Sequence, residues 1–456
     1  MRLNATFATT AASLLLAVSL AAACRRAPPD GLALVGGTLI DGSGGPPLRD
    51  AVIVVRRGRF ESVGTRAGFS LPPRTVEVDV KGRWLIPGLI DAHAHVEPWA
   101  LPRYLAWGVT TVRDVHGDLD SILQLRHRVN LGSVAGPRIY SVGAMIDGLP
   151  TTYPDALGAG TPRDARRAVD RLVRAEVDAV KVYTRVDPTL LKAVIDEART
   201  FNLRVTGHLG LTDAVTAARE GITSIEHLSG VPEAAMPDAS SLLAAHRRGF
   251  FSGWTAFERS WAALDSAALG RVATTLAERK VILVPTLVLH ETFSRLDDPA
   301  VLEDTMLRAV PRVAQQRWNV PDMVKRAGWT AQDYAAFRAA RPQQDRFLRR
   351  FAAAGGTVAT GTDASNQLLI PGYSEHLELA LLQAAGWSPR DALQAATRNG
   401  ALLLGVDSLG LIAPGKAADL VVLRRDPLED IRNALTIDRV MARGVLLSAD
   451  SIRKAW

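Results

Sequence analysis

The sequence predicts an α/β protein: a (β/α)8 TIM-like barrel with a small composite β-sandwich built from both ends of the mature chain. Short apolar segments alternate with helical stretches through the middle of the chain, a pattern typical of βα units and a parallel sheet. Eight such segments can be identified, which is the number that closes this kind of barrel. At both ends of the chain, Gly-rich turns separate short strands of alternating polarity.

The composition is that of a folded globular protein. Of the 456 residues, 47% are hydrophobic and 22% are charged, which excludes a disordered or fibrous chain. The net charge is +7, but the arginines are scattered and only seven of the 54 basic residues are lysines. We therefore expect no nucleic-acid partner. A single cysteine excludes an intrachain disulfide and a cysteine-based metal cage.

The first 23 residues have the features of an export signal, a signal peptide with one basic residue, an apolar run and small residues at its end. The apolar run is too short to span a membrane comfortably. Cys24 follows directly, which resembles the lipobox of bacterial lipoproteins, although Ala21 stands where leucine is usual. The alternative is an ordinary signal peptide with an incidental thiol. We expect an exported, periplasmic or cell-envelope lipoprotein that touches the membrane only through an anchor at Cys24.

The rest of the chain divides into four predicted parts. Residues 24–31 form a tether, residues 32–86 and 406–456 form the two parts of the β-sandwich, and residues 87–405 form the barrel. The eight candidate barrel strands are residues 88–96, 109–115, 138–146, 179–185, 204–209, 224–229, 281–287 and 357–363. A helical insertion at about 291–352 precedes the last strand. It either packs on the barrel or forms a lid that contacts the substrate.

Side chains that can bind metal follow five of the eight candidate strands, at the end where such barrels place their catalytic groups. These residues are His93, His95, Lys181, His208, His227 and Asp363. His93 and His95 are two apart on a strand, so both imidazoles point to one face and suit a single metal ion. Taken one at a time, His208 and His227 could be structural histidines, and Asp363 could cap a helix.

Lys181 is placed in an apolar strand of a chain that is poor in lysine. Burial lowers the pKa of an ammonium and favours the neutral amine. A neutral amine can react with carbon dioxide, giving an anionic carbamate that can bridge two metal ions. A Schiff-base lysine and an ion pair with Asp363 are the alternatives. The four neighbouring histidines favour the carbamate.

Several motifs resemble those of the amidohydrolase superfamily. They are LIPGLIDAHAH, the lysine of the fourth strand, TGH, EH, TGTDA and the C-terminal GLIAPGKAADLVVL. Within the superfamily, the chain most resembles the imidazolonepropionase-like group, which includes Xaa-Pro and Xaa-Arg dipeptidases. The resemblance implies a distorted barrel, a composite β-sandwich and two divalent metal ions, usually zinc. The ligands that it implies are His93, His95 and Asp363 for the buried metal and His208 and His227 for the outer metal, with carbamylated Lys181 bridging them.

This site implies hydrolysis by a hydroxide that the two metals share. Asp363 would take the proton of that hydroxide and pass it to the leaving nitrogen. Tyr183 shares the strand face of Lys181 and could donate a hydrogen bond to the oxyanion. His116 could bind a carboxylate or carbonyl of the substrate.

Three further polar residues lie near the same strand ends. Asp91 shares the face of His93 and could orient an imidazole, or it could make an ordinary strand-end hydrogen bond. Arg113 lies at the end of the second strand, and His290 follows the seventh. Both are weaker candidates for substrate contact, since a structural role explains each of them equally well.

The leading hypothesis is a metal-dependent hydrolase of amide-type C–N bonds in a small molecule such as a dipeptide, an N-acyl amino acid or a cyclic amide. An esterase or lactonase could use the same site. A lipid-anchored binding protein without catalysis is an alternative of a different class. The sequence leaves homo-oligomerisation open.

Overall fold

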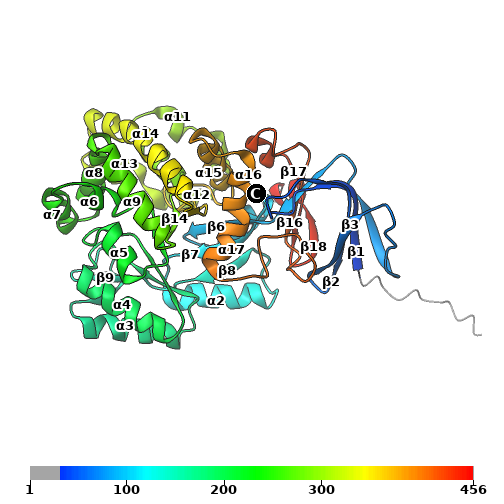
Figure 1. Ribbon diagram of the computed structural model, residues 1–456, viewed down its shortest axis with the longest axis horizontal. Coiled ribbons are helices and arrows are strands. Elements are labelled where there is room, and N and C mark those ends of the chain that lie inside the picture. Colours follow the sequence, from blue (N-terminus) through cyan, green and yellow to red (C-terminus); the bar gives the residue numbers. More distant parts are fainter. Residues whose placement is uncertain (1–30, 455–456) are drawn as a thin grey trace, which may run out of the picture.

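The computed structural model describes residues 31–454, so the predicted signal peptide and Cys24 lie outside the described residues. Figure 1 shows a mixed β-sheet at one end of the molecule and a larger helix-covered part at the other. Within residues 31–454, none of the helices combines the length and the apolar character that crossing a membrane requires.

The mixed sheet brings together strands from the two ends of the chain. Its order is β18-β17-β16-β5-β1-β2-β3, and β4 pairs with β1. The strands are β1 (Gly31–Leu39), β2 (Leu48–Arg56), β3 (Arg59–Thr65), β4 (Thr75–Asp79), β5 (Trp84–Pro87), β16 (Leu420–Leu423), β17 (Ile437–Ala442) and β18 (Val445–Ser448). β5 joins the two sets because it pairs parallel to β1 and antiparallel to β16. Leu34, Ile53 and Leu420 belong to its buried core.

The middle of the chain forms two parallel sheets, which confirms the predicted α/β class. One sheet has the order β6-β7-β8 and the other β10-β9-β11-β12-β13-β14-β15. Their strands are β6 (Leu89–Ala94), β7 (Val109–Asp114), β8 (Arg138–Ser141), β9 (Ile146–Gly148), β10 (Leu157–Ala159), β11 (Ala179–Val182), β12 (Arg204–Gly207), β13 (Ser224–Glu226), β14 (Ile282–Val284) and β15 (Thr357–Val358).

Backbone hydrogen bonds connect both edges of the three-stranded sheet to the seven-stranded sheet. Beyond β15, the carbonyl of Thr360 accepts from Ala92 N (3.0 Å), and Thr362 N donates to the carbonyl of His93 (3.0 Å). At the other edge of the three-stranded sheet, the carbonyl of Ser141 on β8 accepts from Asp178 N, just before β11 (2.8 Å). The first and last segments of the predicted series are therefore neighbours. Closure into one eight-stranded barrel remains a prediction.

Helices follow most of the parallel strands. They are α1 (Leu101–Ala106), α2 (Leu119–Asn130), α3 (Pro162–Arg174), α4 (Pro188–Thr200), α5 (Ala214–Glu220), α6 (Val231–Ala235), α7 (Ser240–Arg248), α8 (Phe250–Ser260), α9 (Ser266–Glu278), α10 (Leu287–Ser294), α15 (Tyr373–Ala384), α16 (Pro389–Gln394) and α17 (Gly400–Leu404), with α18 (Ala449–Arg453) after the mixed sheet. Asp side chains cap α2, α4, α5 and α9 by accepting from backbone N–H groups of their first turns.

The predicted insertion contains α11 (Pro299–Leu302), α12 (Arg312–Trp318), α13 (Val320–Ala327) and the long α14 (Ala331–Ala353). Trp318, Met323 and Phe337 from these helices share a buried apolar cluster with Trp254 of α8. The insertion therefore packs against the helices around the parallel sheets.

Several strands end earlier than the apolar pattern predicts. β12 stops at Gly207, β13 at Glu226 and β15 at Val358. The segments beyond them leave the extended conformation, with φ of +58° at His227 and +62° at Asp363. These turns are buried, so the apolar sequence pattern continues through them although the extended strand conformation ends. The predicted strand 138–146 likewise divides into β8 and β9 around Gly143, which has a φ of +65°.

Candidate active site

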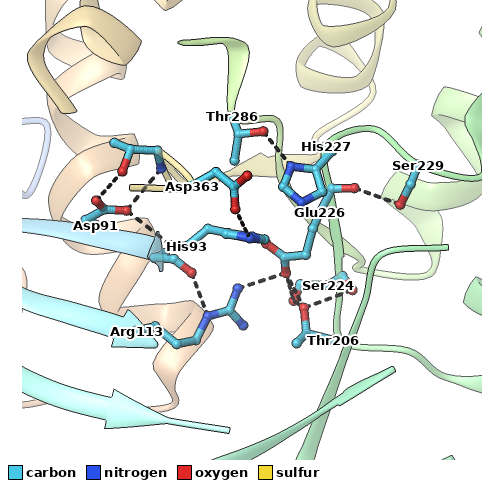
Figure 2. A network of polar contacts seen from close by, with 12 residues as sticks. Asp91, His93, Arg113, Thr206, Ser224, Glu226, His227, Ser229, Thr286 and Asp363 are labelled. Carbon is cyan, nitrogen blue, oxygen red and sulfur yellow. Dashed lines mark hydrogen bonds and ion pairs between the residues drawn. The ribbon is translucent and has the colours of Figure 1, made fainter. Parts of the chain in front are cut away.

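Asp363 lies between the two histidines of the first strand motif. Its Oδ1 is 3.0 Å from Nε2 of His93 and 3.0 Å from Nε2 of His95. His93 is at the end of β6 and almost fully buried, whereas His95 follows the strand and is partly exposed. Three side chains predicted to bind one metal therefore converge on a single point (Figure 2 shows His93 and Asp363).

His227 and His208 lie next to this group. The ring centroid of His227 is 4.4 Å from that of His93 and 4.6 Å from that of His208. Donor atoms of His93, His227 and Asp363 all lie within 4.8 Å of one another, which allows them to hold a metal ion. The cluster thus brings together residues from β6, from the turns after β12 and β13 and from the segment after β15.

Lys181 is on β11 and lines the same cavity. The side chain is buried, and this burial lowers its pKa from 10.5 to about 8. It forms no ion pair with Asp363 among the described residues, so the structural ion pair considered from the sequence is absent. A buried amine with this pKa is neutral in an appreciable fraction of molecules near neutral pH, as the carbamate interpretation requires.

The charges around the cluster suit metal binding. Burial would raise the pKa of Asp363, but hydrogen bonds from His93 and His95 outweigh it and hold that pKa well below 3.8. Burial and the charge of Lys181 lower the pKa of His208 well below 6.5, and burial and the charge of His93 do the same for His227. The carboxylate is thus ionised and these two imidazoles are neutral, and these are the forms that bind metals.

Glu226 is a site residue that the sequence reasoning missed. Its Oε2 is 2.6 Å from Nδ1 of His93, and its Oε1 accepts from Nη2 of Arg113 at 2.8 Å (Figure 2). Thr206 and Ser224 also donate to Oε1. Burial would raise the pKa of Glu226, but Arg113 and His93 outweigh it and keep the pKa well below 4.5. The sequence signal that could have identified Glu226 is the EH pair, because it places a charged residue in a buried strand.

The contacts of Arg113 favour one of the two roles that the sequence left open. Its guanidinium is buried, and besides Glu226 it donates from Nε to the carbonyl of Ala92 at 2.6 Å. Arg113 does not line the cavity. It forms an ion pair with the buried carboxylate of Glu226, so its contacts favour the structural role.

For Asp91 and His290 the contacts likewise favour the structural one of the two roles that the sequence left open. The carboxylate of Asp91 accepts from His93 N (3.2 Å), Thr362 N (3.1 Å) and the Thr362 hydroxyl (2.6 Å), so it fixes backbone and orients no imidazole. Glu226 and Thr286 contact the imidazoles instead, the latter 2.7 Å from Nδ1 of His227. His290 Nε2 lies 3.1 Å from the carbonyl of His227 and outside the cavity lining, so it supports the turn.

The cluster opens into a cavity of about 380 Å³. Tyr183 and His116, the two predicted substrate contacts, both line it. Burial raises the pKa of Tyr183 well above 10, so its phenol stays protonated and can donate a hydrogen bond. Nε2 of His116 is 3.2 Å from Oδ2 of Asp155, and burial lowers the pKa of His116.

The predicted insertion contributes to this cavity. Met323 and Arg326 of α13 line it together with aromatic side chains of α8 and α10. The insertion therefore packs on the helices around the parallel sheets and also supplies side chains to this cavity.

Comparison with known proteins assigns the family. Residues 84–447 match the model of the amidohydrolase family. The chain belongs to the amidohydrolase family. It is therefore an enzyme, a hydrolase of the kind that acts on amide C–N bonds.

Individual relatives of this amidohydrolase agree with the resemblance seen in the motifs. It is 23% identical to ochratoxinase of Aspergillus niger, over 87% of this chain and 82% of that protein. A shorter region, 19% of this chain, is 40% identical to 22% of the imidazolonepropionase of Deinococcus deserti. The crystal structure of a Xaa-Pro dipeptidase with bound methionine superposes with a TM-score of 0.67 at 20% identity, covering 92% of this amidohydrolase and all of that chain.

Proposed function

We propose that this amidohydrolase is a metal-dependent enzyme that cleaves the amide-type C–N bond of a small substrate, such as a dipeptide, an N-acyl amino acid or a cyclic amide. The observation that carries the proposal is the convergence of His93, His95, His227 and Asp363 at the base of a cavity of about 380 Å³. A cavity of this volume accommodates a small molecule.

The donor set fits two divalent metal ions, usually zinc in this superfamily. His93, His95 and Asp363 would hold one ion, His208 and His227 the other, and carbamylated Lys181 would bridge them. The buried, partly neutral amine of Lys181 supports the carbamate. In this proposal the two parallel sheets close as one (β/α)8 barrel, which brings all six residues to one end.

The metals would supply Lewis acidity, lowering the pKa of a water molecule and polarising the scissile carbonyl. Asp363 is ionised at neutral pH, so it can accept the proton of that water and deliver it to the leaving nitrogen. Tyr183 keeps its proton and would stabilise the developing oxyanion. His116 lines the same cavity and would bind a carbonyl or carboxylate of the substrate.

Metal content and turnover test the proposal together. The purified protein should contain close to two equivalents of divalent metal and hydrolyse members of a panel of dipeptides, N-acyl amino acids, cyclic amides, esters and lactones. Lys181→Ala should lose both properties, whereas Lys192→Ala, which changes an exposed lysine of α4, should keep them. Two metal ions and full activity in Lys181→Ala would exclude the carbamate.

The same panel separates the alternatives. Turnover confined to esters or lactones would replace amide cleavage by a different hydrolysis at the same site. A folded protein without bound metal and without turnover would indicate a binding protein. We also propose that the mature protein is exported and anchored at Cys24, a residue outside the described structure.

A further inference from the structure

One wall of the active-site cavity is aromatic. Phe250, Phe251, Trp254 and Phe293 line it. Phe250 and Trp254 lie 6.1 Å and 6.4 Å, between ring centroids, from the predicted metal ligand His208. Phe250 in turn packs against Phe251 at 5.4 Å. The apolar wall therefore runs from the metal-binding cluster outwards.

A cation lies beside this wall. The guanidinium carbon of Arg326 is 5.7 Å from the ring centroid of Phe251. Tyr153, whose side chain is exposed, belongs to the same cavity lining. Among the described residues that line the cavity, Arg326 and Lys181 are the two with cationic side chains, and Lys181 is deep in the cluster.

The geometry of Arg326 leaves donors for a ligand. Its hydrogen bond to Asp322, one helical turn earlier on α13, uses Nε at 2.8 Å. A guanidinium has five N–H donors in a planar fork that matches a carboxylate. The pair with Asp322 thus holds the side chain at the cavity while the terminal nitrogens can still bind an anion.

We infer that Arg326 binds the free carboxylate of the substrate, and that the aromatic wall takes a large apolar or aromatic side chain on the same residue. This inference rests on the proposed amide hydrolysis and adds the substrate class, N-acyl amino acids or dipeptides with an aromatic C-terminal residue. The carboxylate and the side chain leave one Cα, and Arg326 and Phe251 are correspondingly adjacent. Asn366 and Gln367 add amide groups to the same lining.

A ligand without a scissile bond tests the recognition directly. We would measure binding of 3-phenylpropanoate and of the neutral 3-phenylpropanol to the metal-loaded protein by calorimetry. The wild type should bind the carboxylate about tenfold more tightly, since the Arg326 side chain is 64% exposed and solvent weakens the ion pair. Arg326→Gln should reduce this preference to near one. Lys325→Gln, which removes a neighbouring charge outside the cavity lining, should keep it.

Kinetics separates this inference from the proposed function. With N-acetyl-L-phenylalanine, Arg326→Gln should raise KM about tenfold and leave kcat nearly unchanged, and it should not affect turnover of N-acetyl-L-phenylalaninamide. The inference is overturned if Arg326→Gln keeps the full carboxylate preference or if the wild type shows none. Neither result would contradict the proposed amide hydrolysis. If Arg326→Gln loses the carboxylate preference but the wild type hydrolyses no amide, Arg326 is still the anion site and the proposed reaction is refuted.

Discussion

Nδ1 of His93 lies 2.6 Å from Oε2 of Glu226, a residue 133 positions later in the chain and immediately before His227. The contact fixes which nitrogen of His93 faces Asp363. It also connects the segment of His93 with the segment of His227. Carboxylates that hold a metal-binding imidazole in this way affect metal affinity without touching the metal.

Glu226→Gln should therefore weaken metal binding by roughly ten- to a hundredfold. It should also lower the free energy of unfolding by roughly 3 kcal/mol, because the buried Arg113 loses its charged partner. Metal titration of the folded variant measures the first effect and urea unfolding the second. Glu233→Gln is a matched control, since Glu233 is also buried against a histidine, His246 at 2.7 Å, outside the ligand cluster. Equal metal affinity in wild type and Glu226→Gln would show that the contact is only structural.

Asp363→Asn should remove the group that carries the proton. The side chain keeps its size, so the fold should persist, but kcat should fall by roughly 10²- to 10⁴-fold. Steady-state kinetics at matched metal content measures this. Asp345→Asn, which alters an ion pair with Arg341 on α14, should retain full activity. An unchanged rate in the metal-loaded Asp363→Asn variant would exclude it as the proton carrier.

His376 should make the protein less stable in acid. Burial lowers its pKa from 6.5 to about 4, and its Nε2 donates to the carbonyl of Trp107 at 2.8 Å. Between pH 6.5 and 4 the unfolded chain binds a proton that the folded protein does not, so stability falls as the pH falls through this range. The loss from this residue amounts to roughly 3 kcal/mol between pH 7 and pH 4.

His376→Gln should reduce this acid sensitivity, because glutamine can donate the same hydrogen bond without taking up a proton. Urea unfolding of wild type and variant at pH 7 and pH 4.5 measures the difference. His127→Gln, at an exposed histidine of α2, should behave as the wild type does. Parallel pH dependence in wild type and His376→Gln would contradict the assignment.

Cys24→Ser tests the proposed location. If Cys24 carries a lipid, its replacement should release the protein from the membrane fraction into the soluble fraction of the cell envelope. Fractionation followed by immunodetection measures this, and mass spectrometry of the mature N-terminus identifies the acyl group. A Cys24→Ser variant that stays in the membrane fraction would rule out the anchor.

The α/β class and the residue types at the strand ends follow from local patterns along the chain. Alternating apolar residues indicate which segments are buried. A His, Lys or Asp at the end of such a segment can be recognised from a short stretch of sequence alone. His93, His95, Lys181, His227 and Asp363 could be selected in this way, and the structure brings them together. The bends after β12, β13 and β15 were less predictable, since a buried turn is as apolar as a buried strand.

The partners of these side chains could not be inferred from such local patterns. Arg113 looked equally able to face the substrate or the core, and its contact with Glu226 depends on how β7 and β13 are placed in space. Asp91 binds the backbone of a segment 271 residues away. Arg326 reaches the cavity because the insertion folds back over α8. The pattern along a chain records how deeply each residue is buried, whereas hydrogen-bond and ion-pair partners depend on the packing of distant segments.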